Sequence, residues 1–166
     1  FDLPVLDVTH PRFAIAEDAE SLRELYAALA GNERRHRMLP AFLLRYMLRS
    51  AAKRSRLMRA MFSPASDFLD GLSTYVMKLG PDNLMTPYDD EFDRRFARAP
   101  QATFMRLRTQ QVARMLAGAI GDALDGDRGR ALHLVNIAGG PSIDSLNALI
   151  LLAGRSDGLL RRPIAI

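Results

Sequence analysis

The strongest candidate for chemistry is a glycine turn near the C-terminal end of the sequence. An apolar run over residues 132–137 leads into Ala138-Gly-Gly-Pro-Ser142, and a second apolar run follows. Glycines between a strand and a helix allow positive φ angles and let a ligand approach the backbone. The N–H groups that open the helix then present a partial positive charge. The segment predicts a site for a nucleotide-like cofactor, and the alternative is a turn that only reverses the chain.

Residues 134–142, Leu-Val-Asn-Ile-Ala-Gly-Gly-Pro-Ser, resemble motif I of the class I S-adenosylmethionine-dependent methyltransferases. The resemblance covers residues 131–166. Asn136 stands where the family usually has an acid, Ala138 replaces the first glycine and Ser142 the last. The resemblance implies methyl transfer from S-adenosylmethionine to an unidentified small-molecule acceptor. The implied cofactor-binding residues of the turn are Asn136, Ala138, Gly139, Gly140, Pro141 and Ser142.

Arg108 is a further candidate for the cofactor site. Arg108-Thr109 is similar to an Arg-Thr pair that precedes motif I in some carboxyl- and O-methyltransferases, where the arginine binds the cofactor carboxylate. The alternative is an ordinary solvated arginine on an amphipathic helix. A dinucleotide fingerprint fits less well, because Ala138 and Ile143 occupy its first and third glycine positions. A P-loop is excluded because no Gly-Lys-Ser/Thr follows the turn.

Apolar periodicity predicts helices throughout the first three quarters of the chain. The predicted ranges run from a cap at Asp18 to a stop at Gly31-Asn32, then over 40–62, 66–79, 89–97 and 100–124. A buried strand over 132–137, a helix over 142–153 and a second strand from Pro163 complete a parallel βαβ unit. The predicted fold is mainly α: a helical region at 1–128, then the first βαβ unit of an incomplete Rossmann-like sheet at 129–166.

The resemblance also implies how these regions would work together. The helical region would form a lid or a homodimer surface. Further strands would follow Ile166, and a carboxylate at the end of the second strand would hold the cofactor ribose. We therefore expect this chain to belong to a longer methyltransferase, whose catalytic residues lie outside it.

Composition restricts the other classes of function. The chain has 166 residues and no cysteine, which excludes disulfides and thiolate metal sites and suits a cytoplasmic location. Its three histidines are too scattered for a metal site. The acidic residues between 89 and 93 predict the first turn of a helix, with a divalent metal as the alternative. We see no signal peptide or membrane span and expect no membrane partner.

A basic segment supports a second hypothesis of a different class. Residues 34–62 carry nine basic side chains and no acid, whereas the net charge of the chain is only +4. These side chains pair either with the acidic helices beside them or with an external anion. The second hypothesis is a non-catalytic helical module that binds an acidic partner or nucleic acid. Nucleic acid is disfavoured because aromatic residues are sparse in the chain and tryptophan is absent, which weakens an interpretation based on base stacking. The nine are Arg34, Arg35, Arg37, Arg45, Arg49, Lys53, Arg54, Arg56 and Arg59.

Overall fold

The computed structural model describes residues 3–61, 71–125, 129–137, 141–155 and 160–166. Over these residues it is mainly helical, with a small parallel sheet of two strands. The chain divides into two compact units. Unit 1 comprises Leu3 and Ile15–Arg106, and unit 2 comprises Pro4–Ala14 and Leu107–Ile166. The boundary predicted after residue 128 stays a prediction.

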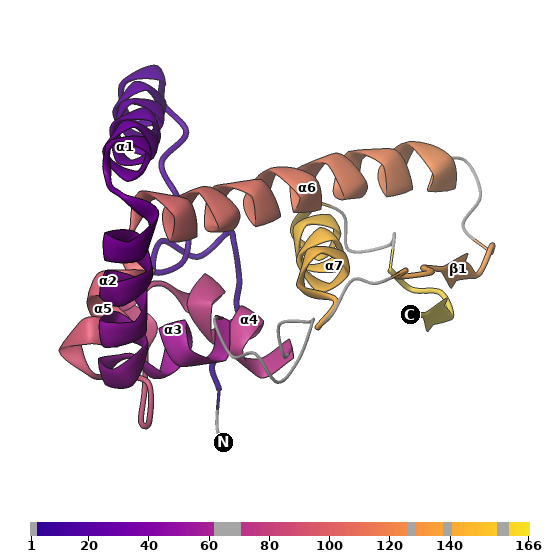
Figure 1. Ribbon diagram of the computed structural model, residues 1–166. Helices are drawn as coiled ribbons and strands as arrows, with labels where there is room; N and C mark the ends of the chain where they lie inside the picture. The colour runs from indigo at the N-terminus through magenta and orange to yellow at the C-terminus, as the bar shows by residue number, and fades with distance from the viewer. Residues whose placement is uncertain (1–2, 62–70, 126–128, 138–140, 156–159) are drawn as a thin grey trace. The chain divides into compact units, whose positions relative to one another are not determined.

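Figure 1 shows the elements in chain order. Within the part of the chain described, no helix is long and apolar enough to cross a bilayer. One long helix, α6, starts in unit 1 and continues into unit 2. Before it, unit 1 contains α1 (Ala19–Met38), α2 (Ala41–Arg54), α3 (Arg56–Met61), α4 (Gly71–Leu79), η1 (Pro81–Asn83) and α5 (Glu91–Ala97). The remaining elements are α6 (Pro100–Leu124), β1 (Leu132–His133), α7 (Ile143–Arg155) and β2 (Ile164–Ala165).

Helix α1 begins where the sequence predicts and ends later. The carboxylate of Asp18 caps it by accepting hydrogen bonds from the amides of Glu20 and Ser21. The bonds from Ser21 lower the pKa of Asp18, so this cap is complete above the ordinary carboxyl pKa and is lost as pH falls through the lowered value. The predicted stop at Gly31-Asn32 is wrong. Glycine costs helix stability without forbidding the helix, and Arg35 donates to the Gly31 carbonyl and to the Asn32 side chain across this turn.

The helix predicted over residues 40–62 is broken at Ser55. Ser55 is fully buried, and its backbone is extended between α2 and α3. Its hydroxyl donates to the carboxylate of Asp93, and the same carboxylate accepts the amide of Leu57 at 3.0 Å. The Ser55 hydroxyl in turn accepts the amide of Met58 at 3.0 Å. These bonds satisfy first-turn amides of α3, so a new helix starts here and the predicted continuous helix does not form.

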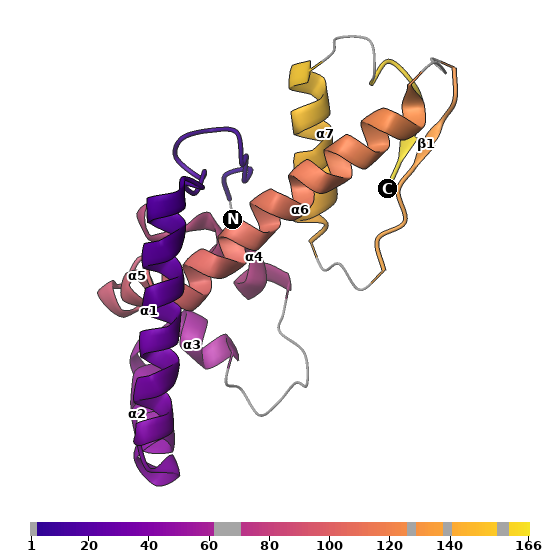
Figure 2. The same ribbon diagram turned by 90° about the horizontal axis from the view of Figure 1, so that it is seen from above.

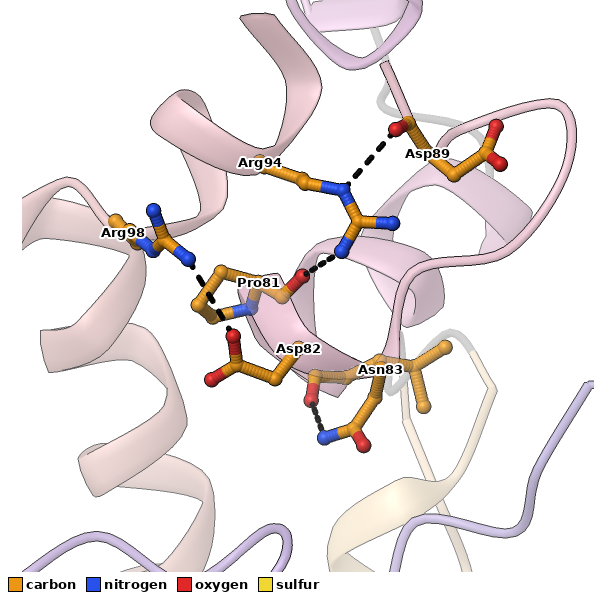
Figure 3. A network of polar contacts seen from close by, with 7 residues as sticks. Pro81, Asp82, Asn83, Asp89, Arg94 and Arg98 are labelled. Carbon is orange, nitrogen blue, oxygen red and sulfur yellow. Dashed lines mark hydrogen bonds and ion pairs between the residues drawn. The ribbon is translucent and has the colours of Figure 1, made fainter. Parts of the chain in front are cut away.

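Polar contacts tie η1 to α5 around the core of unit 1. Figure 3 shows Arg94 between two carbonyls: it donates to Pro81 and to Asp89, each at 3.1 Å. Arg98 forms an ion pair with Asp82 at 3.4 Å. The α5 cap predicted at the acidic cluster is confirmed, because Asp90 accepts the amide of Phe92. Beneath these contacts, the buried side chains of the unit 1 core are Leu57, Val76, Leu84 and Ala97.

Gly80 follows α4 in a backbone conformation that only glycine adopts easily, with φ 85° and ψ 165°. A Cβ at this position would lie 2.5 Å from Cζ of Arg106, so the guanidinium lies directly against the glycine backbone. Burial lowers the pKa of Arg106, and the charge of Asp82 raises it. A side chain at position 80 is therefore unfavourable for two reasons: the backbone there would be strained, and the Arg106 guanidinium would have to move.

We expect Gly80→Ala to lower the free energy of unfolding by about 2 kcal/mol, chiefly through the strained backbone. Chemical denaturation followed by circular dichroism measures this change. Gly31→Ala is the matched control, because a Cβ there meets no atom within 4 Å and Gly31 lies inside α1. That control should gain up to about 1 kcal/mol from helix propensity. Equal effects of the two substitutions would contradict the role assigned to Gly80.

Unit 2 is built on the second part of α6, α7 and the small sheet. Its core contains Ala117, Ile120, Leu124, Leu132, Ala148 and Leu152. The two strands pair in parallel, with Leu132 opposite Ile164 and His133 opposite Ala165, as the βαβ pattern predicts. The predicted strand over 132–137 is too long, because β1 ends at His133 and beyond it, among the described residues, only the Leu134 amide still donates to β2. Val135 and Ile137 beyond it are 84% and 86% exposed.

Candidate cofactor-binding turn

The predicted cofactor turn lies between the end of β1 and the start of α7. Backbone bonds hold the sheet on the strand side: Leu132 donates to Pro163 and Leu134 to Ala165, at 3.0 and 2.9 Å. Arg162 adds a bond to the Arg130 carbonyl at 3.1 Å. On the helix side, the buried Ile143, Ala148 and Leu152 anchor α7. The turn is therefore fixed at both of its ends.

The structure brings Asn136 and Ser142 together. The side-chain amide of Asn136 donates to the Ser142 hydroxyl at 2.7 Å and so closes the turn. Ser142 has a φ of 54°, and its carbonyl accepts the amide of Leu146 as α7 begins. This left-handed residue redirects the chain into the helix, a task that glycine often performs. Pro141 beside it is exposed, while Ala138, Gly139 and Gly140 lie outside the described residues.

The opening turn of α7 presents unused hydrogen-bonding groups. The amides of Ile143, Asp144 and Ser145 donate to no acceptor among the described residues. Oδ1 of Asp144 is buried, and in the same described part of the chain it accepts no hydrogen bond. Free amides at a helix start suit an anionic or carbonyl oxygen. The unused carboxylate oxygen suits a hydroxyl or ammonium donor.

Sequence reasoning missed Asp144. The motif's usual acid position is occupied by Asn136, and the motif has no acid at the position of Asp144. A carboxylate in the first turn of a helix also has a purely structural explanation, because it interacts favourably with the macrodipole. The signal that distinguishes Asp144 is its buried, unpartnered oxygen, which only the structure reveals.

Arg108 is exposed on α6. Among the described residues, no hydrogen bond or ion pair joins it to Asn136, Pro141, Ser142 or Asp144. Its neighbour Thr109 is buried. The contribution of Arg108 to a cofactor site stays a prediction.

A buried asparagine joins the N-terminal arm to α7. The sequence did not predict this role. Oδ1 of Asn147 accepts the amide of Val8 at 2.8 Å. Its Nδ2 donates to the carbonyls of Leu6 and Ile143, each at 3.0 Å. The sequence predicts only an extended arm over the first 16 residues. The one feature of the sequence that could have indicated this contact is that Asn147 is a polar residue among the apolar residues on the buried face of α7.

A hollow of about 370 Å³ in unit 2 is lined by this arm and by α7. Two of its three polar side chains, those of Asp7 and His10, are engaged in local turns. The Asp7 carboxylate accepts the amide and hydroxyl of Thr9, and Nδ1 of His10 accepts the amide of Arg12. In the described ranges, no three His, Asp or Glu side chains are grouped so that they could hold a metal ion. The hollow is lined by Pro4, Val5, Asp7, His10, Arg12, Phe13 and Ile150.

Comparison with known proteins finds no matching family model, no matching curated protein and no matching solved structure. The proposed function is therefore based on the residues of the turn and on the hydrogen-bonding groups in the first turn of α7.

Proposed function

We propose that the turn between β1 and α7 binds S-adenosylmethionine, and that the chain belongs to an S-adenosylmethionine-dependent methyltransferase. The observation that carries the proposal is the first turn of α7. Among the described residues, it places amides that have no acceptor and a buried carboxylate oxygen that has no donor directly after a segment that resembles the family's motif I. The parallel pairing of β1 with β2 across α7 supports the same interpretation.

The donor and acceptor set of the turn fits the methionine part of this cofactor, which carries one carboxylate and one ammonium group. The amides of Ile143, Asp144 and Ser145 match an oxygen acceptor, and Oδ1 of Asp144 matches an ammonium donor. Asn136 and Ser142 form a hydrogen bond with each other, and these two residues flank the segment that contains the glycines. Gly139 and Gly140 leave the backbone without side chains where a ligand would approach.

When bound, the cofactor supplies an electrophilic methyl group. The task of this chain is positioning, because in-line transfer depends on holding the acceptor and the methyl group in an attack geometry. The acceptor belongs to the class of small molecules with a nucleophilic oxygen or nitrogen. We assign no catalytic residue in this chain and place the site in the cytoplasm.

The proposal predicts that S-adenosylhomocysteine binds the full-length protein and that Asp144→Asn weakens this binding. Loss of one charge-assisted hydrogen bond, about 1.5 kcal/mol, corresponds to roughly tenfold weaker binding in isothermal titration calorimetry. Val135→Thr is the matched control, because Val135 is exposed and precedes the turn. Unchanged affinity in Asp144→Asn would remove the assigned role of the carboxylate.

A second candidate function is a non-catalytic helical module whose basic segment binds an acidic partner or nucleic acid. The observation that favours it is the exposure of Arg45, Arg49 and Lys53 on α2, where no described carboxylate pairs with them. It predicts binding to an acidic polymer such as heparin that weakens steeply with salt. Binding that is absent or independent of salt would count against this candidate.

A further inference from the structure

Helix α2 leaves large apolar side chains uncovered. It contains no buried residue. Phe42 and Tyr46, one turn apart, are 75% and 72% exposed, and Met47 is 51% exposed. Figure 2 shows α2 following directly on α1, whose last residue, Met38, is 83% exposed. Neighbouring exposed apolar side chains of this size mark an interaction surface. We call Phe42, Tyr46 and Met47 the α2 apolar face.

A hollow beside this face can receive a partner's side chain. It has a volume of about 230 Å³ and lies between α2 and α5 within unit 1. Arg54 closes part of it, with its Cζ 5.2 Å from the centroid of the Phe92 ring. The hollow is lined by Tyr46, Met47, Ser50, Ala51, Arg54 and Phe92. Apolar walls with a cationic edge favour a partner that brings apolar side chains and carboxylates together.

The charges along α2 are not neutralised within the described residues. Arg45, Arg49 and Lys53 recur every four residues, so they share one side of the helix. Of the nine basic residues between 34 and 59, only Arg37 forms an ion pair there, and its partner is Glu33 of the same helix. The predicted alternative, pairing of the basic segment with adjacent acidic helices, does not account for α2. Any carboxylate that pairs with Arg45, Arg49 or Lys53 therefore lies outside the described ion pairs of this chain.

The chain itself carries the complementary charge on α1. Glu20 and Glu24 are exposed, lie four residues apart and form no ion pair with the described residues. The same helix exposes the small side chains of Ala27 and Ala28 one turn further on. Carboxylates beside small side chains complement cations beside large apolar ones, since the large side chains can pack where the small ones leave room. Glu20 and Glu24 on α1 have the same four-residue spacing as Arg45 and Arg49 on α2, and the exposed Arg23 lies between the two carboxylates in the sequence.

We propose that the α2 apolar face binds α1 of a second copy of this chain. In a two-fold dimer, α2 of each copy would contact α1 of the other, so the contact would occur twice. Arg45 and Arg49 would lie against Glu20 and Glu24 of the partner copy, and Phe42 and Tyr46 would be covered. A membrane surface or nucleic acid would attract the cations but would make no use of the Glu20 and Glu24 carboxylates. The dimer concerns unit 1 and stands independently of the proposed cofactor site in unit 2.

The mass of the full chain in solution, measured by light scattering across a concentration series, tests the proposal. We expect a dimer, and we expect Phe42→Ser with Tyr46→Ser to give a monomer with an unchanged circular dichroism spectrum. Val135→Ser with Ile137→Ser is the matched control, because these side chains are even more exposed but lie in unit 2. A wild-type protein that remains monomeric at all concentrations would overturn the proposal.

Charge reversal separates direct pairing from a folding defect. Arg45→Glu with Arg49→Glu should weaken dimerisation about tenfold or more, because each pair is lost twice in the dimer. Adding Glu20→Arg and Glu24→Arg to the same chain should restore it. Failure of this restoration, with all variants folded, would overturn the α1–α2 pairing. Binding of a monomer to phosphatidylserine vesicles or to single-stranded DNA, without dimerisation, would instead assign the face to that partner.

Discussion

Asn147→Ala should lower the free energy of unfolding by about 3 kcal/mol or more. The substitution removes the acceptor for the Val8 amide and the donor for the Leu6 carbonyl, both in a buried setting. Each backbone group left without a partner costs about 1–3 kcal/mol if the arm stays in place. If the arm leaves instead, the buried side chains of Leu6, Val8 and Phe13 become exposed. Denaturant unfolding measures the total.

The control for Asn147 is another asparagine of unit 2 in a different environment. Asn136 is exposed and forms one side-chain hydrogen bond, to Ser142. Asn136→Ala should therefore cost less than about 1 kcal/mol. Trypsin should also cleave the Asn147→Ala protein faster after Arg12, because that residue lies in the arm. Equal stability losses in the two variants, with no faster cleavage, would contradict the role of Asn147.

Asp93→Ala should be the most damaging single change in unit 1, with a loss of about 3 kcal/mol. Asp93 is fully buried, and its carboxylate accepts both the Ser55 hydroxyl and the Leu57 amide. The variant leaves these two donors without their acceptor and detaches the start of α3 from α5. Thermal unfolding followed by circular dichroism should show a large decrease in Tm.

Asp93→Asn separates the acceptor from the charge. The amide oxygen can still accept both bonds, but its NH2 group replaces Oδ2, which has no partner among the described residues. We expect an intermediate loss, smaller than that of Asp93→Ala. Asp90→Ala, at the exposed cap of α5, should cost only about 1 kcal/mol. The account fails for this site if Asp90→Ala proves more damaging than Asp93→Ala.

The sequence predicts most element types because periodicity and capping are local properties. The range of α6 is confirmed at Pro100–Leu124, and the parallel pairing of β1 with β2 is confirmed. The break at Ser55 could not be predicted, because it depends on Asp93, which lies 38 residues away in the chain. The end of β1 at His133 is also non-local. A strand continues only where a neighbouring strand pairs with it. Strand β2 contains two residues, and they pair with Leu132 and His133.

The candidate site was predictable to a smaller extent. The glycine pattern predicts a turn whose residues 138–140 lie outside the described residues, and Ser142 directly precedes α7, close to the predicted helix start. The hydrogen bond between Asn136 and Ser142 has no sequence signature, because residues six apart can meet in many ways. Asp144 and Asn147 depend on burial of individual atoms, which periodicity does not report. These two residues now carry the sharpest tests of unit 2.

Titration of S-adenosylhomocysteine into the full-length protein tests the central claim most directly. The account predicts saturable binding that is roughly tenfold weaker in Asp144→Asn. It also predicts that Gly139→Val abolishes binding, because in the motif that this segment resembles the central glycines let the cofactor approach the backbone. Unchanged circular dichroism spectra would establish that both variants fold. Absence of binding to the folded wild-type protein would contradict the proposed function.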